Sequence, residues 1–421
     1  MKESEYNIYY KVKEGTIIYN TITAAVLLLD TDNEKDFENF KSKNNKLPKE
    51  LESNLVKGGM ILDDNLDEKE LINLKHMEKR LRHDDLSLTI APTSDCNFRC
   101  PYCYEKGIEH KYMDKDTASK LIEFVKKQGK KKLQVMWYGG EPTLSIDLIQ
   151  DLSKEFIDIF GQENYTAGIV TNGYLLDRDM AKLLTNLNVH FAQITLDGPK
   201  EYHNKRRIHK SGNGSFEEII KNIEEINDLI SIIIRINVDK SNIEYTIRLL
   251  QLLEQKDLLN KVRFYIAPIS DVNAEKRNSY CFTQKEFSEN EKLVYKYFGK
   301  YHPMKPPVSS FGVCGAISLD SFVVSPDGKL YKCWDEIGRH NQEIGDVFNG
   351  ITNINHYLKW VSYHINTYNK KCGSCKYLST CFGGCPYKNM KRKEKDNCLS
   401  MKYNEEEVIL GLLEKRNQMN V

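Results

Sequence analysis

The chain has 421 residues, of which 40% are hydrophobic and 29% charged, and 61 Lys and Arg nearly balance 60 Asp and Glu. This balance provides no global field for binding nucleic acid or a membrane surface. The N-terminus lacks the apolar core of a secretory signal, and the longest apolar runs, Ala24–Leu29 and Leu229–Ile234, are too short to span a bilayer. We therefore expect a cytoplasmic protein with neither a nucleic-acid partner nor a membrane partner.

Residues 1–85 are predicted to form a small α+β unit. Two segments rich in Tyr, Ile, Val and Thr, Tyr6–Lys13 and Thr16–Leu29, are joined by Glu14-Gly15 and predict a hairpin. Helical patterns follow at Glu34–Lys43 and Pro48–Lys57, and a short apolar strand at Met60–Leu62. This order of elements resembles a winged-helix module, and the charged stretch after it predicts a linking helix.

Residues 86–305 alternate between apolar strand candidates and helical patterns, which implies a parallel sheet. Six repeats are too few for an eightfold barrel, so we expect an α/β partial (β/α)6 barrel. The expected strands are Ser87–Ile90, Lys132–Trp137, Thr166–Thr171, Phe191–Leu196, Ile232–Val238 and Val262–Ile266.

Residues 306–421 show less regularity, and most of the 11 cysteines of the chain lie there. A reducing compartment disfavours disulfides, so metal or cluster ligation is the better explanation for so many thiols. We expect a cysteine-rich domain organised by metal, with a closing helix at Asn404–Arg416.

Three cysteines follow the first barrel strand in the pattern C-x3-C-x2-C: Cys96, Cys100 and Cys103. Closely spaced thiolates suit zinc or an iron–sulfur cluster. A zinc knuckle would need a fourth ligand, for which His110 is the candidate. Three ligands on a cluster instead leave one iron open for chemistry.

This pattern resembles the radical S-adenosylmethionine (SAM) enzymes, in which the open iron of a 4Fe–4S cluster binds SAM and cleaves it reductively. The resemblance implies that Cys96, Cys100 and Cys103 ligate this cluster and that Tyr102 lies beside the adenine. Further motifs of the family stand at successive strand ends, where barrel sites lie. They imply SAM contacts from Gly139, Gly140, Glu141, Asn172, Thr195, Asp197 and Arg235.

The C-terminal cysteines are similar in spacing to the SPASM extension of radical SAM enzymes that modify peptides and proteins. A zinc ribbon is the alternative for such a set. The resemblance implies two auxiliary 4Fe–4S clusters, three clusters in all. The inner one would be held by Cys314, Cys333 and Cys385, and the outer one by Cys372, Cys375, Cys381 and Cys398.

The inner auxiliary cluster lacks an evident fourth ligand. Sulfatase-maturating relatives carry one further cysteine just upstream, whereas Met304–Val313 contains none. Cys281 is either that ligand or a buried structural thiol. An open iron could bind a substrate thiolate and favour thioether formation.

The resemblance leads us to expect a peptide maturase that installs crosslinks, most simply thioethers, on a ribosomally made precursor. Its partners would be a precursor whose leader adds as a strand to the N-terminal unit, and an electron donor such as flavodoxin or ferredoxin. The alternatives are a carbon–carbon or carbon–oxygen crosslink, a sulfatase-maturating enzyme that makes formylglycine, and a non-catalytic electron-transfer or zinc protein. Sulfatase maturases place an Asp base after the equivalent of Cys333, whereas here Trp334 stands there and Asp335, the candidate base, follows.

Overall fold

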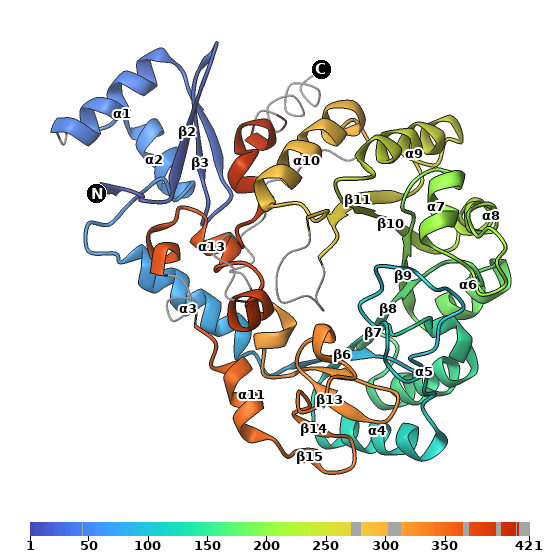
Figure 1. Cartoon of the computed structure of the whole chain (residues 1–421). Helices are drawn as coiled ribbons and strands as arrows, with labels where there is room; N and C mark the ends of the chain where they lie inside the picture. The colour runs from blue at the N-terminus through green and yellow to red at the C-terminus, as the bar shows by residue number, and fades with distance from the viewer. Residues whose placement is uncertain are drawn as a thin grey trace.

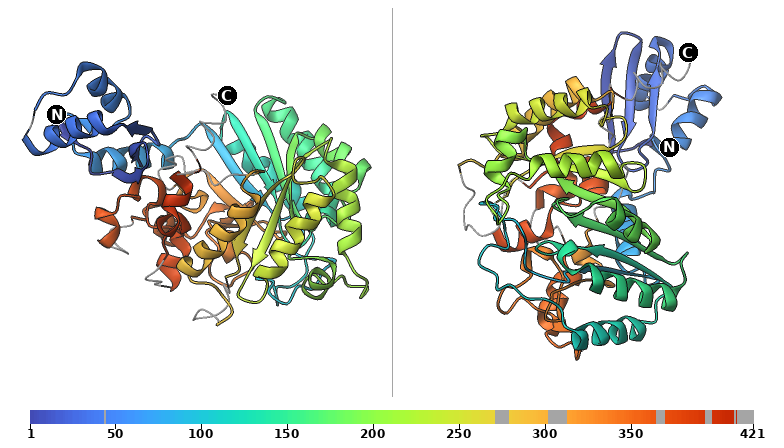
Figure 2. Two further views of the ribbon diagram at one scale, coloured as in Figure 1. Left: turned by 90° about the horizontal axis from the view of Figure 1, so that it is seen from above. Right: turned by 90° about the vertical axis from the view of Figure 1, so that its right-hand side faces the viewer.

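The computed structural model describes residues 1–43, 45–270, 279–301, 313–364, 370–392, 397–409 and 411. Three parts follow one another along the chain: a small N-terminal α+β unit, a large curved sheet flanked by helices, and a C-terminal segment between them (Figure 1). In the view from above, the N-terminal unit projects from one side of the molecule (Figure 2).

The central sheet has ten strands in the order β11-β10-β9-β8-β7-β6-β12-β13-β14-β15. Its first six strands are mutually parallel, as the alternation of strands and helices predicts, and the sheet does not close into a barrel. They are β6 (Asp85–Ile90), β7 (Lys132–Trp137), β8 (Tyr165–Thr171), β9 (Val189–Thr195), β10 (Ser231–Val238) and β11 (Arg263–Pro268).

Helices cover the convex face of this sheet and form the main core with it. Alternate strand residues such as Leu88, Val135 and Ile234 are fully buried there against helix residues such as Leu121 and Ile223. The helices are α4 (Lys115–Lys127), α5 (Ile146–Phe160), α6 (Arg178–Asn186), α7 (Lys200–Arg206), α8 (Phe216–Ile226), α9 (Ile243–Gln255) and α10 (Gln284–Phe298). The opposite strand residues face the inside of the open barrel.

The C-terminal segment continues the central sheet, which the sequence did not predict. Strand β12 (Ser321–Val324) lies parallel to β6, and β13 (Lys329–Tyr331), β14 (Gly345–Asp346) and β15 (Gly350–Ile351) follow antiparallel. Helix α11 (Ile354–Val361), the short helix α13 (Leu378–Cys381) and several single turns complete this part. The predicted helix Asn404–Arg416 lies only in part within the described residues, of which 405–409 are helical.

The N-terminal unit contains a three-stranded antiparallel sheet, β2 (Asn7–Val12), β3 (Gly15–Asn20) and β4 (Val26–Leu29). The single strand predicted over Thr16–Leu29 is wrong, because the chain turns at Thr21–Ala25 and returns as β4. Helices α1 (Thr31–Lys43) and α2 (Lys49–Lys57) cover one face, and the linking helix α3 (Glu68–Arg80) follows the paired strands β1 (Lys2–Glu3) and β5 (Ile61–Leu62).

The other face of this sheet packs on the C-terminal segment. Ile8, Ile17 and Tyr19 share a buried cluster with Tyr377 and Met401. Hydrogen bonds also join the N-terminal unit to the C-terminal segment. Lys376 Nζ donates to Asn7 O at 2.6 Å, and Ser379 Oγ donates to Thr21 O at 2.7 Å. The N-terminal unit is therefore docked against the segment that carries the last four cysteines.

Candidate functional site

The loop that carries the first three cysteines follows β6 and is held from two sides. Gly140 N and Glu141 N donate to Thr93 O (3.1 Å) and Asp95 O (2.8 Å). A Cβ on Gly140 would lie 2.2 Å from Asp95 O, so only glycine permits this approach. The Gly139-Gly140 pair therefore serves close packing of the loop after β7 against the cysteine loop.

The three thiols of Cys96, Cys100 and Cys103 gather at this edge of the sheet and are partly buried. Burial raises the pKa of Cys96 to about 12 and that of Cys103 to about 11, and Cys100 adds to both shifts. Such thiols stay protonated unless a metal centre replaces the proton. Among the described residues, no three His, Cys, Asp or Glu side chains are arranged to hold a single metal ion. A cubane cluster does not require that arrangement, because each cysteine ligates a different iron.

Glu141 occupies a buried polar pocket behind the cysteine loop. Its carboxylate is 1% exposed and accepts hydrogen bonds from Thr143 Oγ1 (2.6 Å), Thr171 Oγ1 (2.6 Å) and Asn172 N (2.7 Å). Burial raises its pKa although these bonds oppose the shift. The carboxylate thus joins the ends of β7 and β8, and its predicted contact with SAM stays a prediction.

Asn172 connects the end of β8 to the cysteine loop. Its Nδ2 donates to Asn97 Oδ1 at 2.6 Å, and its Oδ1 accepts from Tyr174 N at 2.9 Å. Asn97 Nδ2 is buried and has no hydrogen-bond partner among the described residues. This leaves one buried donor at the edge of the thiol group.

Asp197, at the end of β9, lies at the centre of a buried charged network. Its Oδ2 accepts from the Tyr102 hydroxyl and from Arg206 Nε at 3.4 Å, while Arg207 Nη1 donates to Tyr102 Oη at 3.1 Å. Arg206 also donates to Asp239 Oδ2 at 2.8 Å. Tyr102, expected beside the adenine, is thus tied to Asp197 through its hydroxyl group.

The charged network retains unused hydrogen-bonding capacity. Asp197 Oδ1, Arg206 Nη2 and Arg207 Nε are buried without a partner among the described residues. Buried polar atoms are rarely left unpaired, so these atoms fit a polar ligand beside Cys100. A molecule with amino, carboxylate and hydroxyl groups, such as SAM, has the complementary chemistry.

Thr195 and Arg235 are brought to the same edge by strand pairing. They are direct partners in the parallel pair β9–β10, and Arg235 is also opposite Tyr265 of β11. Arg235 Nε donates to Asn237 Oδ1 at 2.8 Å and its Nη1 to Tyr265 Oη at 3.2 Å. The guanidinium is held on the inner face of the sheet.

Cys314, Cys333 and Cys385 form a second thiol group from three distant parts of the C-terminal segment. All three adjoin one buried cluster that includes Trp360 and Tyr387. Burial raises their pKa values; Cys385 raises the pKa of Cys314 further, and Cys314 and Cys385 both raise that of Cys333. The negative charge of Asp335 acts in the same direction, so this carboxylate lies beside the group.

Four cysteines of the C-terminal segment line one pocket. Among its lining residues are Cys372, Cys375, Cys381 and Cys398, the four for which the resemblance implies the outer cluster. Lys402 Nζ lies 3.7 Å from Cys398 Sγ. A cavity surrounded by four thiols fits an iron–sulfur cluster held entirely by protein ligands.

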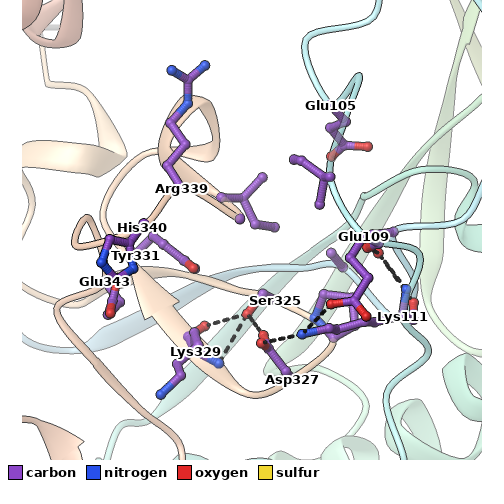
Figure 3. A pocket seen from close by; sticks show the side chains of 16 residues that line it. Glu105, Glu109, Lys111, Ser325, Asp327, Lys329, Tyr331, Arg339, His340 and Glu343 are labelled. Atoms are coloured by element: carbon purple, nitrogen blue, oxygen red, sulfur yellow. Dashed lines mark hydrogen bonds and ion pairs between the residues drawn. The ribbon is translucent and has the colours of Figure 1, made fainter.

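A pocket of about 290 Å³ lies between the cysteine loop and the β12–β13 hairpin (Figure 3). Lys111 of the loop lies 3.2 Å from Glu109 and 3.5 Å from Asp327 of the hairpin, and Glu105 and Arg339 lie on opposite sides of the pocket. Burial raises the pKa of Glu105 to about 7. Trp334 is 50% exposed and stacks on Tyr138 with ring centroids 6.3 Å apart.

The sequence reasoning missed Asn97, Arg206 and Arg207, which belong to the site by contact. The only local signal is the cationic run Lys205–Lys210, which begins in the helix after β9. Charge runs usually mark solvated surface, so this one did not indicate a buried network. Cys281 is buried just before α10, and its predicted roles remain open.

The chain matches the family model of the radical SAM superfamily over residues 90–253. This range begins at the end of β6 and ends in α9, so it includes the cysteine loop, Glu141, Asp197 and Arg235. Residues 90–253 are a radical SAM domain. The protein is therefore an enzyme, and the domain implies one 4Fe–4S cluster and SAM as its cofactors.

Curated relatives match a larger share of the chain than residues 90–253. A cysteine-type anaerobic sulfatase-maturating enzyme of Clostridium perfringens is 24% identical over 356 residues, 76% of this chain and 93% of that protein. The corresponding enzyme of Clostridium novyi is 26% identical over 341 residues, 71% of this chain and 87% of that protein.

Two solved structures share the fold. The native sulfatase-maturating enzyme anSMEcpe with bound AdoMet and Cp18Cys peptide has a TM-score of 0.62 at 21% identity, and the match covers 80% of this chain and 99% of that one. Streptococcus suis SuiB bound to its precursor peptide SuiA has a TM-score of 0.56 at 18% identity, covering 95% of this chain and 98% of that one. Among the described residues, no helix is long and apolar enough to cross a membrane.

Proposed function

We propose that the protein is a radical SAM peptide maturase that modifies a ribosomally made precursor, with thioether crosslinking as its reaction. The observation that carries the proposal is that ten cysteines lie in groups of three, three and four, of which the first two are joined by electrostatic contacts between thiols and the third by one shared pocket. The first group lies in the radical SAM domain, and the other two lie in the C-terminal segment.

The three groups differ in what they would hold. Cys96, Cys100 and Cys103 would ligate the SAM-binding 4Fe–4S cluster, which supplies the electron that cleaves SAM to a 5′-deoxyadenosyl radical. Around it, the unpaired atoms of Asp197, Arg206 and Arg207 would bind and orient the polar groups of SAM. The two remaining groups would hold the inner and outer auxiliary clusters.

The inner group would leave one iron position without a protein ligand, unless Cys281 completes it. Such a position suits the thiolate of a precursor cysteine, because a metal lowers the pKa of a bound thiol. Asp335 lies beside this group and would accept the proton released as the thiol binds. Thioether formation removes two hydrogens overall: one would leave carbon as an atom to the 5′-deoxyadenosyl radical, one would leave sulfur as a proton, and the inner auxiliary cluster would accept the remaining electron.

The N-terminal unit would bind the leader of the precursor as an added strand. In the three-stranded sheet, β4 is an edge strand with the sequence Val-Leu-Leu-Leu, and its first three residues are partly exposed. The likeness to SuiB bound to its precursor spans 95% of this chain and so includes most of this unit. Both observations support a peptide substrate with a leader.

Formylglycine formation in a sulfatase is the second candidate, because two curated relatives that match 76% and 71% of this chain are sulfatase-maturating enzymes. Trp334 argues against this candidate, because it occupies the position directly after Cys333. Sulfatase-maturating enzymes have there the Asp that acts as a general base. The indole of Trp334 is exposed and stacked on Tyr138, and it has no group that could act as a general base at this position.

The test is to search the reading frames beside the gene for a short cysteine-containing peptide and to incubate that peptide anaerobically with the reconstituted enzyme, SAM and reductant. We expect a product that has lost two hydrogens and one alkylatable thiol. A peptide that loses its cysteine sulfur would indicate formylglycine. A product that loses two hydrogens but keeps every thiol would indicate a carbon–carbon or carbon–oxygen crosslink.

A further inference from the structure

Arg235 is a cation on the inner face of the open barrel that has only neutral partners among the described residues. Its neighbours in β10, Ile234 and Ile236, belong to the main core, so the partly buried side chain of Arg235 lies on the opposite face. Its Nε donates to Asn237 Oδ1 at 2.8 Å, and its Nη1 donates to Tyr265 Oη at 3.2 Å. Within the described ranges, its Nη2 has no hydrogen-bond partner. A guanidinium with this free edge fits the carboxylate of a ligand.

The surroundings of Arg235 indicate SAM as the source of that carboxylate. Burial raises the pKa of Tyr138 to about 12, and the charge of Arg235 opposes this shift, so the guanidinium faces the end of β7. Tyr138 stands directly before Gly139-Gly140-Glu141, the motif for which SAM contacts are predicted. Arg235 is also paired across β9 and β10 with Thr195, another predicted SAM contact.

Tyr265 holds the guanidinium of Arg235 in two ways. Its hydroxyl oxygen accepts the hydrogen bond from Nη1, and the centre of its ring lies 5.7 Å from the guanidinium carbon. The two residues are direct partners in the parallel pair β10–β11. Both contacts therefore act on one group from a single neighbouring strand.

Gln193 fixes the orientation of the Tyr265 hydroxyl. Tyr265 Oη donates to Gln193 Oε1 at 2.8 Å. Because a phenol has only one proton to donate, its oxygen is then left to accept from Arg235. Gln193, Arg235 and Tyr265 belong to β9, β10 and β11, which are neighbours in the sheet (Figure 1). The three side chains form one hydrogen-bonded row across the inner face.

We propose that Tyr265, with its hydroxyl oriented by Gln193, is a positioning residue that directs the guanidinium of Arg235 toward the carboxylate of SAM. Without the hydroxyl, the long side chain of Arg235 samples more orientations in the free enzyme. Ordering it on binding then costs additional free energy, which weakens the affinity for SAM. The inference rests on the proposed SAM site beside Cys96, Cys100 and Cys103.

The test is a double-mutant cycle on SAM affinity, measured by equilibrium dialysis of labelled SAM with the anaerobically reconstituted full-length enzyme. Tyr265→Phe keeps the ring and removes the hydroxyl, and Arg235→Gln removes the cation. The matched control is Tyr165→Phe, which removes a hydroxyl that donates to Ser153 Oγ at 3.1 Å within the main core. Iron content and thermal unfolding of each variant report whether clusters and fold are retained.

We expect Tyr265→Phe to weaken SAM binding about tenfold, the lower end of what a hydrogen bond to a charged group contributes. In the Arg235→Gln background the same change should have no effect, because Tyr265 acts through the guanidinium. Gln193→Met, which releases the hydroxyl, should weaken SAM binding less than Tyr265→Phe does. Iron content should be the same in all variants, and the control should bind SAM as the wild type does.

Equal SAM affinity of the wild type and Tyr265→Phe would overturn the inference. Equal losses from Tyr265→Phe in both backgrounds would also overturn it, because they would mark a role in the fold that does not pass through Arg235. If Arg235→Gln binds SAM as tightly as the wild type, Arg235 does not contact SAM and the inference fails with that contact. A wild-type enzyme that retains its iron and binds no SAM would instead contradict the proposed function.

Discussion

The junction between helix α3 and the C-terminal segment should weaken in acid because of one buried histidine. His76 is 1% exposed, and its ring stacks on Phe382 with centroids 3.5 Å apart and an angle of 11°. Burial, together with the charges of Arg80 and His364, lowers the pKa of His76 to about 3. Its Nε2 has no hydrogen-bond partner among the described residues.

The size of the effect follows from the difference between folded and unfolded protonation. With a pKa of about 3 in the folded state and about 6.5 in the unfolded state, only the unfolded state binds a proton between these values. Stability is therefore fully present above about pH 6.5 and is lost as the pH falls. At about pH 5 the loss is roughly 2 kcal/mol, or about a 30-fold increase in local opening.

Hydrogen exchange of the α3 amides, corrected for the intrinsic exchange rate at each pH, measures this opening. The matched variant is His76→Phe, which keeps a stacked ring against Phe382 and cannot titrate. We expect the wild type to open about 30-fold more at about pH 5 than at neutral pH, and the variant to change much less. An equal acid response in both proteins would refute the assignment to His76.

Other predictions concern the clusters and the substrate. Anaerobic reconstitution should give about three 4Fe–4S clusters, and replacing Cys96, Cys100 and Cys103 together by Ala should remove about a third of the iron and all SAM cleavage; retained cleavage would reject the core assignment. Deleting residues 1–80 should abolish precursor binding, measured by fluorescence anisotropy, and spare uncoupled SAM cleavage, while undiminished affinity would make the unit a simple cap. Addition of the precursor should perturb the electron paramagnetic resonance spectrum of the auxiliary clusters, and a Cys→Ser precursor should leave it unchanged. Cys281→Ala should keep all iron and activity, whereas loss of one cluster would identify Cys281 as the fourth ligand.

Local patterns predicted the part of the molecule in which neighbouring chain segments are also neighbours in space. The alternation of strands and helices predicted six parallel strands, and each motif was expected where its strand ends. Gly139 and Gly140 illustrate why this worked: their role depends on the adjacent strand β6, which pairs directly with β7.

Contacts between distant segments had no local signature. The pairing of β12 with β6 joins residues that lie more than two hundred positions apart. Arg207 enters the site only because its side chain reaches Tyr102 across the cysteine loop. The docking of the N-terminal sheet on Tyr377 and Met401 likewise depends on tertiary packing that no short pattern encodes.

The central claim is that a radical derived from SAM abstracts a hydrogen atom from a peptide. The most direct measurement is anaerobic turnover with a precursor that is deuterated at its carbon-bound positions, followed by mass analysis of the 5′-deoxyadenosine. We expect deuterium to appear in 5′-deoxyadenosine in step with formation of the modified peptide. Modified peptide accompanied by unlabelled 5′-deoxyadenosine would contradict it.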